Sequence, residues 1–90
     1  MNKQDLIRKV AVDSEITQRQ AGIVLDNTFS LIMDALAEGD KVQILGFGTF
    51  EARQRAARSG RNPSTGETME IPATTVPVFK PGREFKEAVN

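Results

Sequence analysis

Apolar residues recur every three or four positions near the start of the chain, which is the spacing of one face of a helix. Asn2 and Asp5 stand three residues apart just before this pattern and form a variant of the capping box that opens many helices. The pattern therefore predicts a first helix over residues 3–13. The apolar side chains expected to share one face of this helix are Leu6, Ile7, Val10 and Ala11.

A second, longer helix is predicted after residue 16. Thr17 and Gln20 form a fuller capping box, and the helix runs from there to Glu38, with Gly39 as the first residue beyond its end. Its apolar side covers an arc of about 160° on a helical wheel, more than one core requires. That arc holds Ala21, Val24, Leu25, Thr28, Phe29, Leu31, Ile32, Ala35 and Leu36. Periodicity alone leaves two interpretations open, a helix that meets two partners and a helix that lines one thick core.

Two short strands and a tight connection are predicted in the middle of the chain. Residues 41–45 alternate between polar and apolar, as in a strand with one buried face. Gly46 and Gly48 flank Phe47, which suits a hairpin turn whose backbone approaches a neighbour closely. A phosphate-cradling loop is the alternative, but the longer glycine pattern and the lysine of such loops are absent. A structural turn into a second strand is the preferred interpretation.

The end of the chain predicts one more strand and a short helix. Residues 76–79 alternate again, and Pro77 places this strand at a sheet edge or end because proline has no N–H to donate. Residues 83–89 predict a last helix. The side chains expected to turn inward from it are Phe85, Ala88 and Val89. Cations at a spacing of three, which fit either a DNA-facing flank or a solvated face, are Lys80, Arg83 and Lys86.

Between these strands, residues 51–75 contain only two large apolar side chains, Met69 and Ile71. So polar a stretch cannot join a core. Four arginines precede its centre with no acid among them, and the run Asn-Pro-Ser-Thr-Gly at residues 62–66 marks a chain reversal. These features favour a two-stranded basic arm with Pro63 at its tip, which suits the groove of a polyanion. A solvated loop or disordered linker has the same composition and stays open as the alternative.

Length and charge limit the size of the fold and its partners. The chain has 90 residues, enough for one domain with a modest core, so we expect a dimer or a very plain fold. Its 12 basic and 12 acidic residues cancel, but acids outnumber bases in residues 1–40 and the reverse holds in residues 41–90. The basic half is therefore the half that carries the predicted arm.

The residue types that are absent limit the chemistry. The chain has neither cysteine nor histidine, which removes thiolates, disulfides and the commonest general base and metal ligand. The carboxylates have no metal-ligand spacing and no partner for nucleophilic catalysis, so we expect no enzyme, no metal and no other cofactor. No apolar run is long enough for a signal peptide or a membrane span, and a cytosolic protein with no membrane partner is expected.

Four segments carry a resemblance to a known family. They are the opening residues 1–7 (Met-Asn-Lys-x-Asp-Leu-Ile), residues 39–50, the tip at residues 60–66 and the ending at residues 76–82. Together they resemble the bacterial HU/integration host factor family of DNA-bending proteins, and HU more closely, over essentially the whole chain. The resemblance implies an α+β fold: an intertwined homodimer with a helical base, a short antiparallel sheet and a protruding two-stranded β-arm in each subunit.

The resemblance also implies a layout for the chain. Residues 1–90 would form a single domain. Its implied parts are a helical base at about 1–39, a sheet at about 41–52 and 75–80, a β-arm at about 53–74 and a C-terminal helix at about 83–89. The wide apolar arc of the second helix would then be a dimer surface. The shared dimer core implied in this way comprises Phe29, Ile32, Leu36, Leu45, Phe47, Phe50 and Phe79.

DNA-binding residues follow from the resemblance as well. Pro63 would insert between base pairs at a kink. The other residues implied are Arg58, Arg61, Asn62 and Thr65 in or along the minor groove, Arg53 and Arg55 at the base of the arm, and Lys80, Arg83 and Lys86 on the flank of the body. The backbone at Gly46 would lie near a phosphate. Lys3 is a further phosphate candidate, although an ion pair with an acid such as Asp26 explains it equally well.

The function implied is largely sequence-independent binding and bending of double-stranded DNA in the bacterial nucleoid, with a preference for nicked, gapped or bent forms. A paralogous subunit and RNA are further candidate partners. A sequence-preferring bender of the integration host factor type and a module whose arms bind another protein stay open as alternatives. HU proteins are usually distinctly basic, whereas this chain is neutral and carries Glu51, Glu67 and Glu70 in or beside its arm, which bears on affinity and salt tolerance.

Overall fold

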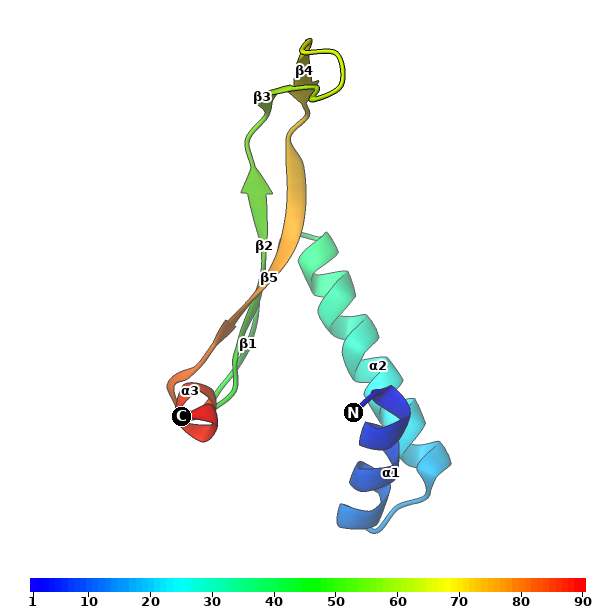
Figure 1. Ribbon diagram of the computed structural model, residues 1–90. Coiled ribbons are helices and arrows are strands. Elements are labelled where there is room, and N and C mark those ends of the chain that lie inside the picture. Colours follow the sequence, from blue (N-terminus) through cyan, green and yellow to red (C-terminus); the bar gives the residue numbers. More distant parts are fainter. The chain divides into compact units, whose positions relative to one another are not determined.

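A computed structural model describes residues 1–90, which divide into two compact units, Met1–Asp34 and Ala35–Asn90. In chain order the elements are α1 (Lys3–Asp13), α2 (Gln18–Ala37), β1 (Val42–Ile44), β2 (Gly48–Arg55), β3 (Arg58–Arg61), β4 (Thr68–Ile71), β5 (Thr74–Pro81) and α3 (Arg83–Val89) (Figure 1). The predicted α+β class is confirmed, with three helices and antiparallel strands. None of the helices combines the length and apolar character needed to cross a membrane.

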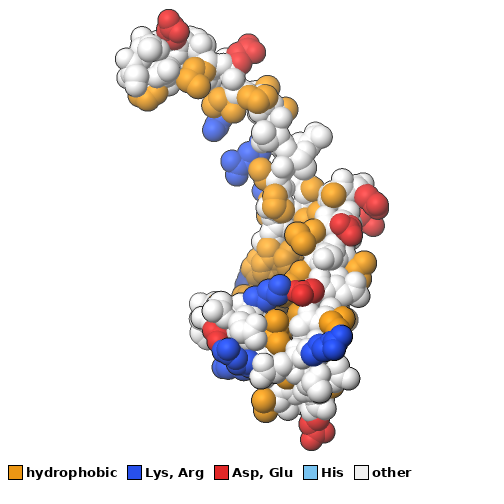
Figure 2. Space-filling view, turned by 90° about the vertical axis from the view of Figure 1, so that its right-hand side faces the viewer, with side chains coloured by type: hydrophobic (Ala, Val, Ile, Leu, Met, Phe, Trp, Pro, Cys, Tyr) orange, Lys and Arg blue, Asp and Glu red, His pale blue; other side chains and the backbone are white.

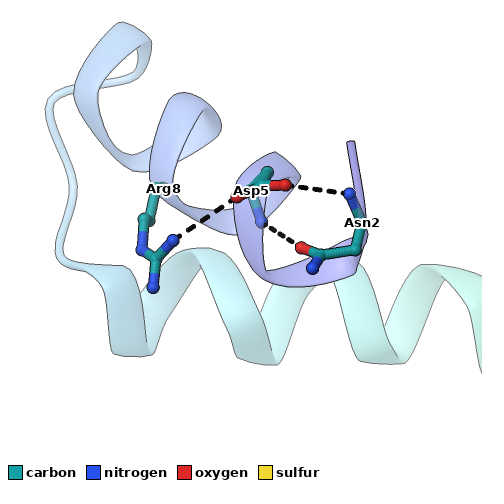
Figure 3. Close-up of polar contacts among 3 residues, drawn as sticks. All are labelled: Asn2, Asp5 and Arg8. Carbon is teal, nitrogen blue, oxygen red and sulfur yellow. Dashed lines mark hydrogen bonds and ion pairs between the residues drawn. The ribbon is translucent and has the colours of Figure 1, made fainter.

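The predicted capping box opens α1 (Figure 3). The side-chain oxygen of Asn2 accepts a hydrogen bond from the backbone N–H of Asp5 at 2.9 Å, and the Asp5 carboxylate accepts one from the N–H of Asn2 at 3.0 Å. Arg8 Nη1 donates to the same carboxylate at 3.4 Å, one turn further on. Two N–H groups that a helix start leaves without partners are thereby satisfied, and α1 covers the predicted residues.

The signals at both ends of α2 are also present in the structure. Thr17 and Gln20 exchange backbone-to-side-chain hydrogen bonds of 3.0 Å. At the other end the helix stops at Ala37, and the N–H of Gly39 donates to the carbonyl of Leu36 at 3.0 Å. Gly39 has φ of +83°, a left-handed conformation that costs glycine little. The predicted glycine stop is therefore confirmed.

The core of the first unit is small. Only Ile7, Ala11 and Ala21 are buried, and the partly buried side chains packed against them are Val10, Ile16 and Leu25. Leu6, on the same predicted face of α1, is 40% exposed, because the contact between α1 and α2 is narrow. Large apolar side chains exposed on α2 are Ile23, Val24, Phe29, Leu31 and Met33. In this single chain, then, α2 does not line one thick core.

The second unit is built on a three-stranded antiparallel sheet in the order β1-β2-β5. Ile44 pairs with Gly48 across the predicted hairpin, and Gly46 at its end has φ of +83°. A side chain at Gly48 would lie 2.6 Å from the carbonyl oxygen of Lys80, so this position requires glycine. Pro77 lies in β5, which is an edge strand as its missing N–H predicts.

Aromatic rings pack together at one end of this sheet. Phe50 and Phe79 are cross-strand partners with ring centroids 4.7 Å apart, and Phe47 and Phe85 each contact Phe79 at 5.2 Å and 5.7 Å. Phe85 of α3 thus turns inward as predicted. Phe85 is the residue of α3 that contacts the aromatic cluster. The same expectation is therefore wrong for Ala88 and Val89. Ala88 and Val89 are exposed and line the rim of an open depression beside Phe47.

Candidate nucleic-acid interface

The arm consists of two short antiparallel ladders in one continuous register. β2 and β5 pair outward as far as Arg55 opposite Thr74, and β3 and β4 resume with Arg58 opposite Ile71. The residues skipped on the returning strand include Pro72, which has no N–H to donate. The ladder is therefore interrupted but the register is not. Pairing along both ladders favours the predicted two-stranded arm over the open loop.

Nearly every side chain of the arm is exposed. Within residues 53–75 only Gly60 and Asn62 are half-buried, and the rest are exposed. Figure 2 shows basic side chains along the arm below its outer end and acidic ones at the end itself. A ribbon that buries so little against its own chain gains little from folding alone. Its side chains are available to a partner.

The tip is held by the turn residues that the sequence indicates. The Asn62 side-chain oxygen accepts a hydrogen bond from the N–H of Ser64 at 2.9 Å, and its backbone carbonyl accepts one from Gly66 at 2.7 Å. Gly66 has φ of +74°. Thr65 Oγ1 accepts from the N–H of Glu67 at 3.3 Å. Asn62 and Thr65, both candidate groove contacts, therefore shape the turn that presents the exposed ring of Pro63.

The arginines of the arm differ in their surroundings. Arg55, Arg58 and Arg61 are exposed and take part in no ion pair. Alternation along β3 puts Arg58 on the face that also carries Ile71, its cross-strand partner, whereas Arg61 lies on the opposite face across from Thr68. The two outer arginines thus reach to both sides of the ribbon.

At the base of the arm, cations gather around a single carboxylate. Lys80 Nζ lies 2.7 Å from Glu51 Oε1, Arg53 Nη2 lies 3.6 Å from the same oxygen, and Lys41 Nζ lies 3.6 Å from Oε2. The hydrogen bond from Lys80, aided by the charges of Lys80 and Lys41, lowers the pKa of Glu51 below its ordinary value. Arg53 and Lys80, two candidate DNA contacts, are therefore already engaged by an acid.

The other flank candidates have mixed surroundings. Arg83 Nε donates to Glu87 Oε1 at 3.0 Å within α3, while Lys86 has no acidic partner. A carboxylate oxygen of Glu84 lies 2.9 Å from the position that a Cβ atom would occupy at Gly46. A carboxylate there repels a phosphate, so Gly46 is the weakest of the candidate contacts.

In the first unit, Lys3 is engaged by an acid. Its Nζ lies 2.5 Å from Asp26 Oδ1 on α2, so the ion pair offered as an alternative to a phosphate contact is present. Both side chains are more than half exposed, and such pairs contribute little to stability. Of the candidate cations, only four have no acidic partner: Arg55, Arg58, Arg61 and Lys86.

The side chains expected in a dimer core lack cover in this single chain. Leu45, at the end of the β1–β2 hairpin, is 98% exposed, and Phe29 and Phe47 are exposed as well. The remaining members are half-buried: Ile32, Leu36, Phe50 and Phe79. Phe47, Phe50 and Phe79 contact one another inside the second unit. Their place in a dimer stays a prediction.

Sequence reasoning missed the role of Glu51 and Lys41. Glu51 was noted only as an acid that weakens a basic arm, and Lys41 was not considered as a site residue. The signal was available, because residues at alternate positions of paired strands share one face of a sheet. The pairing of β1 with β2 and of β2 with β5 puts Lys41, Glu51, Arg53 and Lys80 on the face opposite the aromatic rings.

Comparison with known proteins agrees with this geometry. A family model described as "Bacterial DNA-binding protein" matches residues 1–90. The chain belongs to this family. Among its curated relatives, DNA-binding protein HU 1 of Bacillus subtilis is 55% identical over 89 residues, covering 99% of this chain and 97% of the relative. DNA-binding protein HU of Geobacillus stearothermophilus is 56% identical over 89 residues, covering 99% of both. The resemblance to HU drawn from the sequence is thus confirmed.

Solved structures of the same family share the fold. A cocrystal structure of Anabaena HU with DNA superposes with a TM-score of 0.93 at 50% identity, covering 99% of this chain and 97% of that one. HU from Thermotoga maritima superposes with a TM-score of 0.71 at 34% identity, and each chain is covered completely. The arrangement of helices and strands is therefore that of the HU fold.

Proposed function

We propose that this protein is an architectural DNA-binding protein of the bacterial nucleoid, which binds duplex DNA with little sequence preference and bends it. The observation that carries the proposal is the arm: a paired ribbon with exposed side chains and three arginines free of acidic partners. Its kinship with HU supports the choice of DNA as partner, since the Anabaena relative is described in a cocrystal with DNA. The site of action is the nucleoid of the bacterial cytoplasm.

The proposed contact is with the minor groove. Arginines are attracted to its negative potential, and a two-stranded ribbon with arginines reaching to both sides can follow its two walls. The residues proposed to bind through the arm are Arg53, Arg55, Arg58, Arg61, Asn62, Pro63 and Thr65, with Lys80, Arg83 and Lys86 on the flank and Lys3 and Gly46 as weaker contacts. Minor-groove architectural proteins, HU among them, insert apolar wedges between base steps, and Pro63 is the wedge proposed here.

A homodimer completes the proposal. No large side chain of the chain is fully buried, and many of the exposed large apolar residues lie on α2 and at the β1–β2 hairpin. Apolar surface of this kind is characteristic of chains that fold together with a second copy. Two arms in one dimer would grip the same duplex, so the bend and the affinity both depend on assembly. The single-domain layout over residues 1–90 belongs to the same proposal.

The test is a competition titration on an intact linear duplex and on the same duplex with a central nick. Bending an intact site costs about 1–6 kcal/mol, and a nick lowers this cost. Relief of half of a mid-range cost gives roughly tenfold tighter binding to the nicked form. Binding should also fall steeply as salt rises, because phosphate contacts release counterions.

Two outcomes would contradict the proposal. Absence of binding to either DNA in low salt would exclude the function itself. Equal affinity for nicked and intact duplex would exclude bending as its basis. A scan of base substitutions on the intact duplex tests sequence tolerance: losses of about 1–3 kcal/mol at individual positions would instead indicate a sequence-preferring bender.

A further inference from the structure

Glu51 has an unusual position for an acid in a DNA-binding surface. Its side chain is 12% exposed, whereas the side chains of Lys41, Arg53 and Lys80 around it are more than half exposed. All four lie on the same face of the sheet, at the base of the arm. The carboxylate therefore sits at the centre of the group and the cations at its rim.

The distances separate one strong pair from two loose ones. Lys80 Nζ makes a close ion pair with Glu51 at 2.7 Å, while Lys41 and Arg53 make looser ion pairs with it at 3.6 Å. An approaching phosphate offers Lys80 the same kind of oxygen that Glu51 already provides. Lys80 can neutralise that phosphate fully only if its pair with Glu51 is loosened.

We propose that Glu51 is a positioning residue that competes with phosphate for Lys80 and thereby limits the affinity and the salt dependence of DNA binding. This inference rests on the proposed function. Without the charge of Glu51, the same basic surface would bind DNA more tightly.

The informative variant is Glu51→Gln, which keeps the shape and an acceptor for Lys80 but removes the charge. If Lys80 then engages one more phosphate per subunit, each subunit releases about 0.9 more counterion. Binding of an intact duplex should become several-fold tighter in low salt, and the slope of log affinity against log salt should steepen by about 0.9 per subunit. Glu38→Gln is the matched control, because Glu38 is exposed and in no ion pair.

A double-mutant cycle with Lys80→Gln tests whether the effect passes through Lys80. We expect Glu51→Gln to tighten binding when Lys80 is present and to change little when it is absent. Lys80→Gln alone, in a protein that retains Glu51, should lower the salt slope by much less than 0.9 per subunit. This last measurement does not depend on the folding of the Glu51 variant.

The inference is overturned if Glu51→Gln changes affinity and slope no more than Glu38→Gln does. It is also overturned if Lys80→Gln alone lowers the slope by the full increment, since Lys80 would then already be engaged with phosphate. A wild-type protein that binds no duplex in low salt is a different result, because it removes the proposed function itself. Unfolding curves of each variant, recorded at one protein concentration, separate loss of binding from loss of fold.

Discussion

The two hairpin ends of the second unit use the same backbone device and opposite side-chain chemistry. Each turns with the help of a glycine in the left-handed conformation, Gly46 at +83° and Gly66 at +74°. The β1–β2 end presents Leu45, which is 98% exposed, together with Phe47. The arm end presents Pro63 between polar turn residues, with arginines behind it. Neither end is buried in its own chain, so each is complementary to something outside it.

The difference indicates two kinds of partner. An exposed leucine and phenylalanine lose contact with water only by packing on another apolar surface, which a second copy of the chain supplies. Exposed arginines keep their charge and need an anion, which a DNA backbone supplies. Substitutions at the apolar end should therefore change stability, and substitutions at the arm should change binding while the fold is retained.

The largest effect is expected at the apolar end. Leu45→Ala should lower the free energy of unfolding by about 2–5 kcal/mol for each leucine that the dimer buries. A leucine that stays in solvent would give a change within about 0.5 kcal/mol. Urea unfolding at several protein concentrations measures both the loss and the assembly, since the midpoint of a dimer rises with concentration.

Val12→Ala is the matched control for this measurement. Val12 is 76% exposed on α1 and is not among the proposed dimer residues, so its truncation should be nearly neutral. Equal, small effects at Leu45 and Val12, together with a midpoint independent of concentration, would show that the apolar hairpin end has no partner.

At the arm end, Pro63→Ala should narrow the preference for nicked DNA, which is expected to be roughly tenfold in the wild type. The substitution removes the ring that would hold a kink open and leaves every charge in place. The bend angle, read by energy transfer between labels on the DNA ends, should fall while the salt slope stays nearly the same. A variant that bends and discriminates like the wild type would reduce Pro63 to a turn residue.

A smaller effect is expected from a single arginine of the arm. Arg61→Ala should lower the slope of log affinity against log salt by about 0.9 for each arm engaged. Between 50 and 200 mM salt, the affinity of the variant should therefore fall by roughly threefold less per arm than that of the wild type. The loss should be similar for different sequences, because the contact is with phosphates or the groove potential. Arg19→Ala on α2 removes the same charge from an exposed position outside the arm and should change little. Equal effects from the two would mean that the arm is not the binding element.

Local signals were sufficient for most of the fold. Capping boxes at Asn2 and Thr17 and the stop at Gly39 are written in a few neighbouring residues, and the structure contains all three. The inward faces were harder. Leu6 and Val89 have the spacing of apolar helix faces, but both are exposed because the contacts of their helices are narrow. The spacing of apolar residues does not show how wide a contact is.

The site was predictable in outline only. Composition indicates that the arm is basic, but ion pairing depends on the register of the paired strands, which composition does not give. Arg53 and Lys80 were expected to contact DNA, and each has Glu51 beside it. For Lys3, the ion pair with Asp26 that the sequence left open as an alternative is the one present. Glu51 is the clearest case, because its effect changes from simple repulsion of DNA to organisation of the surrounding cations once β1, β2 and β5 are aligned.

The smallest expected effect is a pH dependence of stability that originates at Glu51. Its pKa in the folded protein is below the ordinary value of 4.5, chiefly because Lys80 donates a hydrogen bond to it. The folded state therefore binds this proton less readily than the unfolded state does. The resulting stabilisation is fully present above the ordinary pKa and is lost as pH falls through the folded-state value.

The difference between the free energies of unfolding of wild type and Glu51→Gln isolates this contribution, because the other acids are the same in both proteins. The charged groups that face Glu51 are Lys41, Arg53 and Lys80. The difference should be constant above about pH 5.5 and shrink below the ordinary pKa. Adding Lys80→Gln to both proteins should flatten it, because the main cause of the lowered pKa is then gone. A difference that grows as the solution becomes more acidic would mean that the surrounding cations do not stabilise the Glu51 carboxylate. Glu51 would then not be the residue that organises the cations at the base of the arm.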